Sequence, residues 1–178
     1  MSKANNVVFI ILQVVAWLIF VGLCIETGGF VVNFIFSIYN PEVLDHLYQK
    51  LDITELYEGK KVVFFSVYSF ILAISFLKAG LFYIVIRLML KLDLMKPFNS
   101  FVVRQVALLS YFTLSIGVLS AFAKEFINRL MLHGFSSDSL QQQWNDGEAF
   151  ILMGAVIYII AVIFKRGVEI QSENDLTV

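Results

Sequence analysis

Four long apolar runs dominate the pattern of hydrophobic and polar positions along the chain. They cover residues 7–25, 62–86, 101–123 and 149–164. A helix needs about 20 mostly apolar residues to cross the hydrocarbon core of a bilayer. The runs are continuous, whereas the strands of a transmembrane barrel alternate apolar and polar positions. The pattern therefore predicts an all-α integral membrane protein, a four-transmembrane-helix bundle.

The segments between the runs carry helix starts and stops. Residues 92–100 form a short loop that makes the second and third spans an antiparallel hairpin. Pro97 stops one helix, and Asn99 or Ser100 can cap the next, because their side chains accept from free N–H groups. Gly28-Gly29 is predicted to break the first helix, since glycine weakens a helix interior.

Two longer segments, residues 26–61 and 124–148, lie on the other side of the bundle. The first contains two helix starts, at Asn40-Pro41-Glu42 and at Asp52-x-x-Glu55. Its aromatic residues suit the boundary between lipid headgroups and water. We therefore expect the two segments to form one small extracytoplasmic helical cap.

Composition supports lipid as the solvent. Apolar residues make up 59% of the chain and charged residues 15%, against about 45–50% and 25% in soluble domains. With both ends in the cytoplasm, seven of the 13 Lys and Arg residues lie inside and five outside. Ten acids lie outside and four inside. The excess of positive charge inside predicts an N-in, C-in topology, with residues 167–178 as a cytoplasmic tail.

Few residues are available for chemistry. The chain has one cysteine and two histidines, and neither histidine has metal-ligand spacing to an acid. No catalytic, cofactor-binding or metal motif is present, and no nucleic-acid signature. We expect a protein that is not an enzyme, needs no cofactor and does not bind nucleic acid directly. Its oligomeric state stays open.

Lys78 is the one charged residue deep within a predicted span, and such residues are functional candidates by default. Counted from the predicted inner end of its span, Gln13 lies near the depth of Lys78. The two form a candidate intramembrane polar site. A structural lysine bonded to Gln13, Ser75 or backbone carbonyls is the alternative, and the sequence leaves both open.

Other polar and small residues have simpler interpretations. A polar cluster at the outer end of the third span is interpreted as a solvated rim: Lys124, Glu125, Asn128 and Arg129. Arg104 and Gln105 are interpreted as headgroup anchors. Ser75-x-x-x-Ala79 and Gly117-x-x-x-Ala121 have the small-residue spacing that lets helix backbones approach. We expect these pairs to pack within the bundle.

Four stretches carry a family resemblance. They are IFVGLCIE at 19–26, LKAGLFY at 77–83, KPF at 96–98 and FKRGVEIQSENDLTV at 164–178. Taken together, the chain resembles the small bacterial membrane proteins grouped as domain of unknown function 2975. The resemblance implies a multi-pass protein of the bacterial cytoplasmic (inner) membrane. It also implies a small helix-turn-helix regulator as a neighbour and a partner to consider. That family has no established catalytic residues, so no site is carried over.

The leading function hypothesis is a non-enzymatic sensor or modulator in the lipid bilayer that is coupled to a cytoplasmic regulator. An ordered outer segment, a short defined tail and the implied regulator favour it. The alternative is a carrier or binder of a small anionic or lipidic ligand that uses the intramembrane Lys78. A pocket containing Lys78 favours the carrier, and a closed, packed core favours the sensor.

Overall fold

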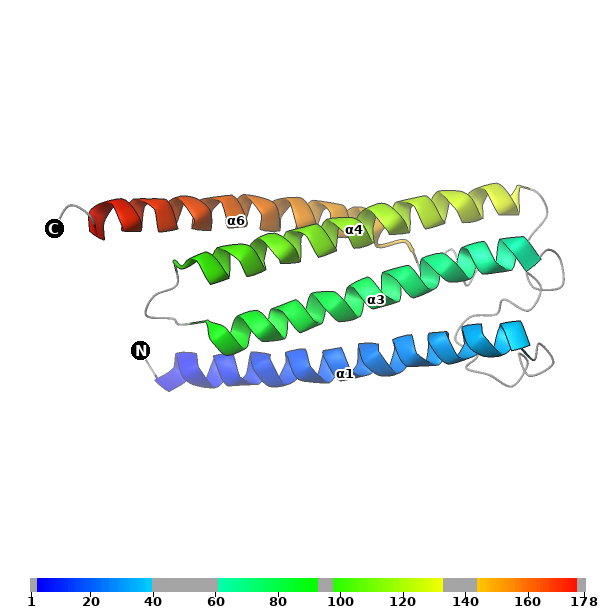
Figure 1. Cartoon of the computed structure of the whole chain (residues 1–178), viewed down its shortest axis with the longest axis horizontal. Coiled ribbons are helices and arrows are strands. Elements are labelled where there is room, and N and C mark those ends of the chain that lie inside the picture. The colour runs from blue at the N-terminus through cyan, green and yellow to red at the C-terminus, as the bar shows by residue number, and fades with distance from the viewer. Residues whose placement is uncertain (1–2, 40–60, 93–97, 133–143, 176–178) are drawn as a thin grey trace.

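The computed structural model describes residues 3–39, 61–92, 98–132 and 144–175, with side chains from residue 7 to 173 within these ranges. This part of the chain forms four α-helices (Figure 1): α1 (Lys3–Tyr39), α3 (Lys61–Lys91), α4 (Ser100–Met131) and α6 (Gly147–Asp175). Each predicted apolar run lies within one of them. The all-α prediction is confirmed.

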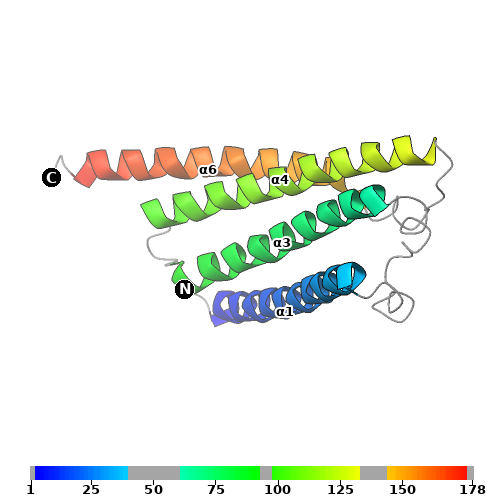
Figure 2. The same ribbon diagram turned by 45° about the vertical axis from the view of Figure 1, so that its right-hand side comes forward.

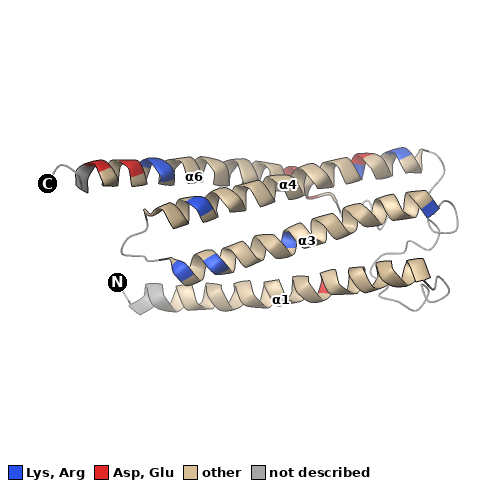
Figure 3. Cartoon of the chain, viewed as in Figure 1, with Lys and Arg blue, Asp and Glu red and all other residues tan. Residues whose placement is uncertain are grey.

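All four helices are long and apolar enough to cross a membrane. Their charged residues gather toward the ends of the helices, and the middle of each is almost free of charge (Figure 3). At 1.5 Å per residue, the 29 to 37 residues of each helix span about 43 to 55 Å. This exceeds the roughly 30 Å of a hydrocarbon core. Each helix is therefore long enough to continue beyond the lipid.

The predicted break at Gly28-Gly29 is wrong, because α1 continues through both glycines to Tyr39. Glycine costs a helix interior only about 0.5–1 kcal/mol relative to alanine, and tertiary contacts offset that cost here. Phe34 packs against Phe65 and Tyr68 of α3, with ring centroids 5.9 and 5.3 Å apart. The apolar segment that follows the glycines is thus the C-terminal part of α1. We call this end of the helices outer and the opposite end inner, after the topology predicted from the distribution of charge.

The helices pack in chain order as an open row. α1 packs on α3, α3 on α4, and α4 most extensively on α6. Figures 1 and 2 show the four helices side by side in this order from two directions. The largest core cluster joins α1, α3, α4 and Trp144 toward the outer ends of the helices, around Tyr68, Ile116 and Ile127.

Small residues bring α4 and α6 close together. A Cβ atom added to Gly117 would lie 2.7 Å from the backbone nitrogen of Ile151. A Cβ on Gly154 would lie 2.9 Å from the backbone nitrogen of Leu114. The Ser110 hydroxyl donates to the Gly154 carbonyl at 2.9 Å. The prediction that Gly117 packs within the bundle is confirmed.

The turn between α3 and α4 shows one predicted cap. The Asn99 side chain accepts from the backbone N–H of Val102 at 2.9 Å, so Asn99 is the N-cap of α4. Phe98 packs on α6, with its ring 5.3 Å from that of Phe164. The helix starts predicted at residues 40–42 and 52–55 lie outside the described residues.

Candidate functional site

A hollow among the described residues lies where α6 begins beside the middle of α4. Gly147 packs against Ser120 and Gly117, yet α4 continues to Met131. This offset leaves a step at the outer end of α6, visible in Figure 1. The chain enters α6 through a turn in which the Gly147 N–H donates to the Trp144 carbonyl. A pocket of about 220 Å³ occupies the step.

Both walls of the outer pocket carry polar residues. α4 contributes Ala121, Lys124, Glu125 and Asn128, and the turn and first residues of α6 contribute Trp144, Asn145, Gly147 and Glu148. Trp144 is only 3% exposed and joins the main core, so it ties the pocket to the packed part of the protein.

Three of the four members of the polar cluster line this pocket, and the interpretation of the cluster as a solvated rim still fits, because Glu125 and Arg129 are exposed. Lys124, Glu125 and Asn128 line the pocket, and Asn128 and Lys124 are half-buried. Arg129 pairs with Glu125 at 2.9 Å in an exposed i,i+4 contact, which contributes little to stability. The second wall could not be predicted from the sequence, because only the packing of α6 on α4 brings Glu148 and Asn145 to this cluster.

The pocket can recognise a small polar molecule by charge and hydrogen bonding. It offers an ammonium group at Lys124, carboxylates at Glu125 and Glu148, and amides at Asn128 and Asn145. The described lining has no histidine, cysteine or serine that could act as a nucleophile or proton shuttle. Among the described residues, no three His, Cys, Asp or Glu side chains come together to hold a metal ion.

Lys78 and Gln13 are each half-buried, on the neighbouring helices α3 and α1, and their assignment to one intramembrane polar site stays a prediction. Phe20 and Tyr83, with ring centroids 6.3 Å apart, fix the register of α1 on α3. Gln13 lies seven residues inward of Phe20, and Lys78 lies five residues outward of Tyr83. At 1.5 Å per residue they are about 18 Å apart along the axis when measured from this contact, and about 10 Å apart when measured from the hydrogen bond of Tyr68 to Phe30. Neither residue belongs to the described lining of the outer pocket.

The burial of neighbouring residues on α3 shows which way Lys78 faces. It follows Val67, Ile71 and Ile74 at spacings of four, three and four residues, and all three are buried. Lys78 therefore continues a stripe that faces the protein. No hydrogen bond or ion pair joins it to another described residue.

Gln105 is a polar residue that sequence reasoning misplaced. It is 3% exposed and not a headgroup anchor, whereas its neighbour Arg104 is exposed. Within the described part of the chain, its Oε1 atom is buried and accepts no hydrogen bond. A buried acceptor of this kind is costly unless water or another group satisfies it.

Comparison with known proteins identified no relative of this chain. No family model matches the chain, and neither a curated protein nor a solved structure matches it. The resemblance to the family named above therefore stays a prediction.

Proposed function

We propose that this chain is a non-enzymatic sensor or modulator of the bacterial cytoplasmic membrane, with both ends inside. A small polar solute in the outer pocket is the signal, and a cytoplasmic regulator is the receiver. The observation that carries the proposal is that α6 is one continuous helix from the pocket to the opposite end of the protein. Its first residues, Gly147 and Glu148, line the pocket, and the same helix continues without a break to Asp175.

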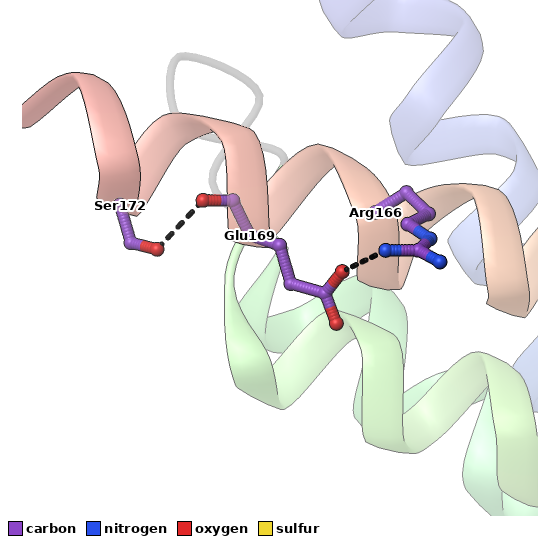
Figure 4. A network of polar contacts seen from close by, with 3 residues as sticks. All are labelled: Arg166, Glu169 and Ser172. Carbon is purple, nitrogen blue, oxygen red and sulfur yellow. Dashed lines mark hydrogen bonds and ion pairs between the residues drawn. The ribbon is translucent and has the colours of Figure 1, made fainter.

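The inner end of α6 supports a role in contacting a partner. Phe98, just before α4, packs at Gly167, so the remaining residues of α6 extend past the beginning of α4 (Figure 1). This part is polar but has an exposed apolar residue, Ile170, at 59% exposure. Arg166 pairs with Glu169 at 3.0 Å, and the Ser172 hydroxyl donates to the Glu169 carbonyl at 2.7 Å (Figure 4).

The packing of α6 supports transmission along its length. Gly117 and Gly154 hold α6 against α4 at backbone distance, so the two helices form one closely packed unit. A ligand that favours one position of the first turn of α6 would therefore favour one position of its inner end. Coupling between distant sites needs such a contiguous rigid element with two arrangements.

The carrier hypothesis lacks a comparable observation. It needs a cavity around Lys78, and the described pocket lies at the outer end of α4 without that residue. We therefore keep the sensor as the proposed function. A small helix-turn-helix regulator, which the family resemblance implies, is the first partner to look for.

A photoreactive residue in place of Ile170 tests the proposed function. In native membranes it should cross-link to one defined cytoplasmic protein, because Ile170 is exposed beyond the beginning of α4. The same residue in place of Leu152, which is 70% exposed within the apolar part of α6, is the matched control and should capture no such protein. Equal capture from both positions, or capture of a protein from the opposite side of the membrane, would contradict the proposal and its orientation.

A further inference from the structure

Three positively charged residues gather at the inner ends of α3 and α4. Arg87 and Lys91 are one helical turn apart on α3, and Arg104 follows Phe101 by three residues on α4. The Lys91 ammonium lies 5.6 Å from the centroid of the Phe101 ring, so this contact joins the two helices. At 1.5 Å per residue, Arg87 lies about 6 Å and Arg104 about 4.5 Å outward of the contact, so the arginines share one depth. We call Arg87, Lys91 and Arg104 the inner cationic surface.

The inner cationic surface faces one side of the row of helices. On α3, Gly80 packs against a ring of α4, and Tyr83 packs against a ring of α1. Arg87 follows these two residues by seven and four positions, so it projects between the directions of the two neighbouring helices. Lys91 is one turn further along and reaches Phe101 from the same side. All three cationic side chains are exposed.

The positive charge of this surface is not neutralised by the described part of the chain. No hydrogen bond or ion pair joins any of the three cations to another described residue. α3 contains no acidic residue, and the one acid of α4, Glu125, lies toward the outer end. Figure 3 shows blue residues without red ones at this end of the two helices. Arg166 on α6 differs, because it pairs with Glu169 at 3.0 Å. The inner cationic surface can therefore accept an anion from outside the protein.

The surface next to the cations changes from polar to apolar with depth. Tyr83 lies four residues outward of the arginine on α3, and Tyr111 lies seven residues outward of the arginine on α4, which is about 6 and 10 Å. Both tyrosines are exposed, and tyrosine suits the boundary between headgroups and acyl chains. Two helical turns further outward on the same faces are the exposed apolar residues Phe76 and Val118. The order of cation, tyrosine and apolar side chain matches the phosphate, glycerol and acyl chains of a phospholipid.

We propose that the inner cationic surface binds an anionic phospholipid. Its phosphate lies between Arg87, Lys91 and Arg104, where the planar guanidinium groups donate charge-assisted hydrogen bonds to phosphate oxygens. Its acyl chains follow α3 and α4 outward past Tyr83 and Tyr111. A zwitterionic lipid binds less well, because its own cationic group offsets the phosphate charge. The proposal rests on the proposed placement of the chain in a membrane, and not on the outer pocket or the sensor function.

Native mass spectrometry of the full-length protein in detergent micelles tests the lipid site. Equal amounts of dioleoyl phosphatidylglycerol and dioleoyl phosphatidylcholine are added, and the wild-type protein should retain roughly tenfold more of the anionic lipid. The double variant Arg87→Gln with Arg104→Gln should lose this preference, because each basic residue near an anionic lipid contributes roughly fivefold in affinity. Lys61→Gln with Arg129→Gln is the matched control, since it removes one cation from each of the same two helices at their outer ends. The control should keep the preference.

Equal retention of the two lipids by the wild-type protein would overturn the proposal, whether or not the variants fold. An equal loss in the control variant would also overturn it, because net charge and not this surface would then set the preference. Arg87→Lys with Arg104→Lys keeps both charges and should keep a preference for the anionic lipid. Glycerol 3-phosphate at tenfold excess over the lipid should not displace it, because it has no acyl chains. Displacement would identify a site for a soluble anion and contradict a lipid site.

Discussion

Gly117→Leu should unfold or separate the α4–α6 pair, lowering the free energy of unfolding by about 3 kcal/mol or more. The reason is backbone contact. A Cβ at this position would lie 2.7 Å from the Ile151 nitrogen and 2.9 Å from the Gly147 oxygen. Backbone atoms cannot move aside as a flexible side chain can, so the helices must part. Denaturant titration of the full-length protein in bicelles measures the loss.

Gly22→Leu is the matched control. Nothing lies within 4 Å of a Cβ added to Gly22, and the residue is exposed on α1. We expect this change to be neutral or slightly stabilising, since a glycine in a helix interior costs about 0.5–1 kcal/mol relative to alanine. Equal losses from the two substitutions would mean that close packing of α4 on α6 does not hold the pair together.

Tyr68→Ala should be comparably damaging, lowering the free energy of unfolding by about 3–5 kcal/mol, which is typical of a large buried aromatic residue. Tyr68 is 1% exposed and packs between Phe34 and Phe64, with ring centroids 5.3 and 5.4 Å away. Its hydroxyl also donates to the Phe30 carbonyl across the α1–α3 interface. The substitution thus removes packing and a hydrogen bond together.

Tyr68→Phe separates these two contributions. It keeps the ring and removes the hydroxyl, so we expect a loss of about 1 kcal/mol in the same titration. Phe76→Ala on the same helix is the control, because Phe76 is 57% exposed and should be tolerated far better than Tyr68→Ala. A Phe76→Ala loss as large as that of Tyr68→Ala would contradict the assignment of the core.

The helices themselves were predictable from the sequence because four continuous apolar runs leave little alternative in a chain with 15% charged residues. The Asn99 cap was predictable too, because its chemistry is local. The end of the first helix was not. Local glycine content suggested a stop, whereas distant contacts of Phe34 with α3 continue the helix.

The pocket of the candidate site could not be predicted, because it depends on how α6 packs on α4 and not on local sequence. Lys124 and Glu125 were visible as a polar cluster, but the pocket exists only because α6 begins beside the middle of α4. That offset is set by the contacts of Gly117 and Gly154. The depth of Lys78 relative to Gln13 could not be predicted accurately, for a related reason. It was counted from the predicted ends of the spans, and the register of α1 on α3 was not available.

The measurement that tests the central claim most directly is the capture experiment at Ile170, repeated with a changed outer pocket. Glu148→Gln and Trp144→Ala alter the first turn of α6 and the wall of the pocket. Leu152→Ala, in the exposed apolar part of α6, is the control. If the pocket is coupled to the tail, the two pocket variants should change the yield of cross-linked partner by about fivefold or more, a typical coupling between linked sites, and the control should not. Unchanged capture in both pocket variants would contradict a sensor that acts through α6.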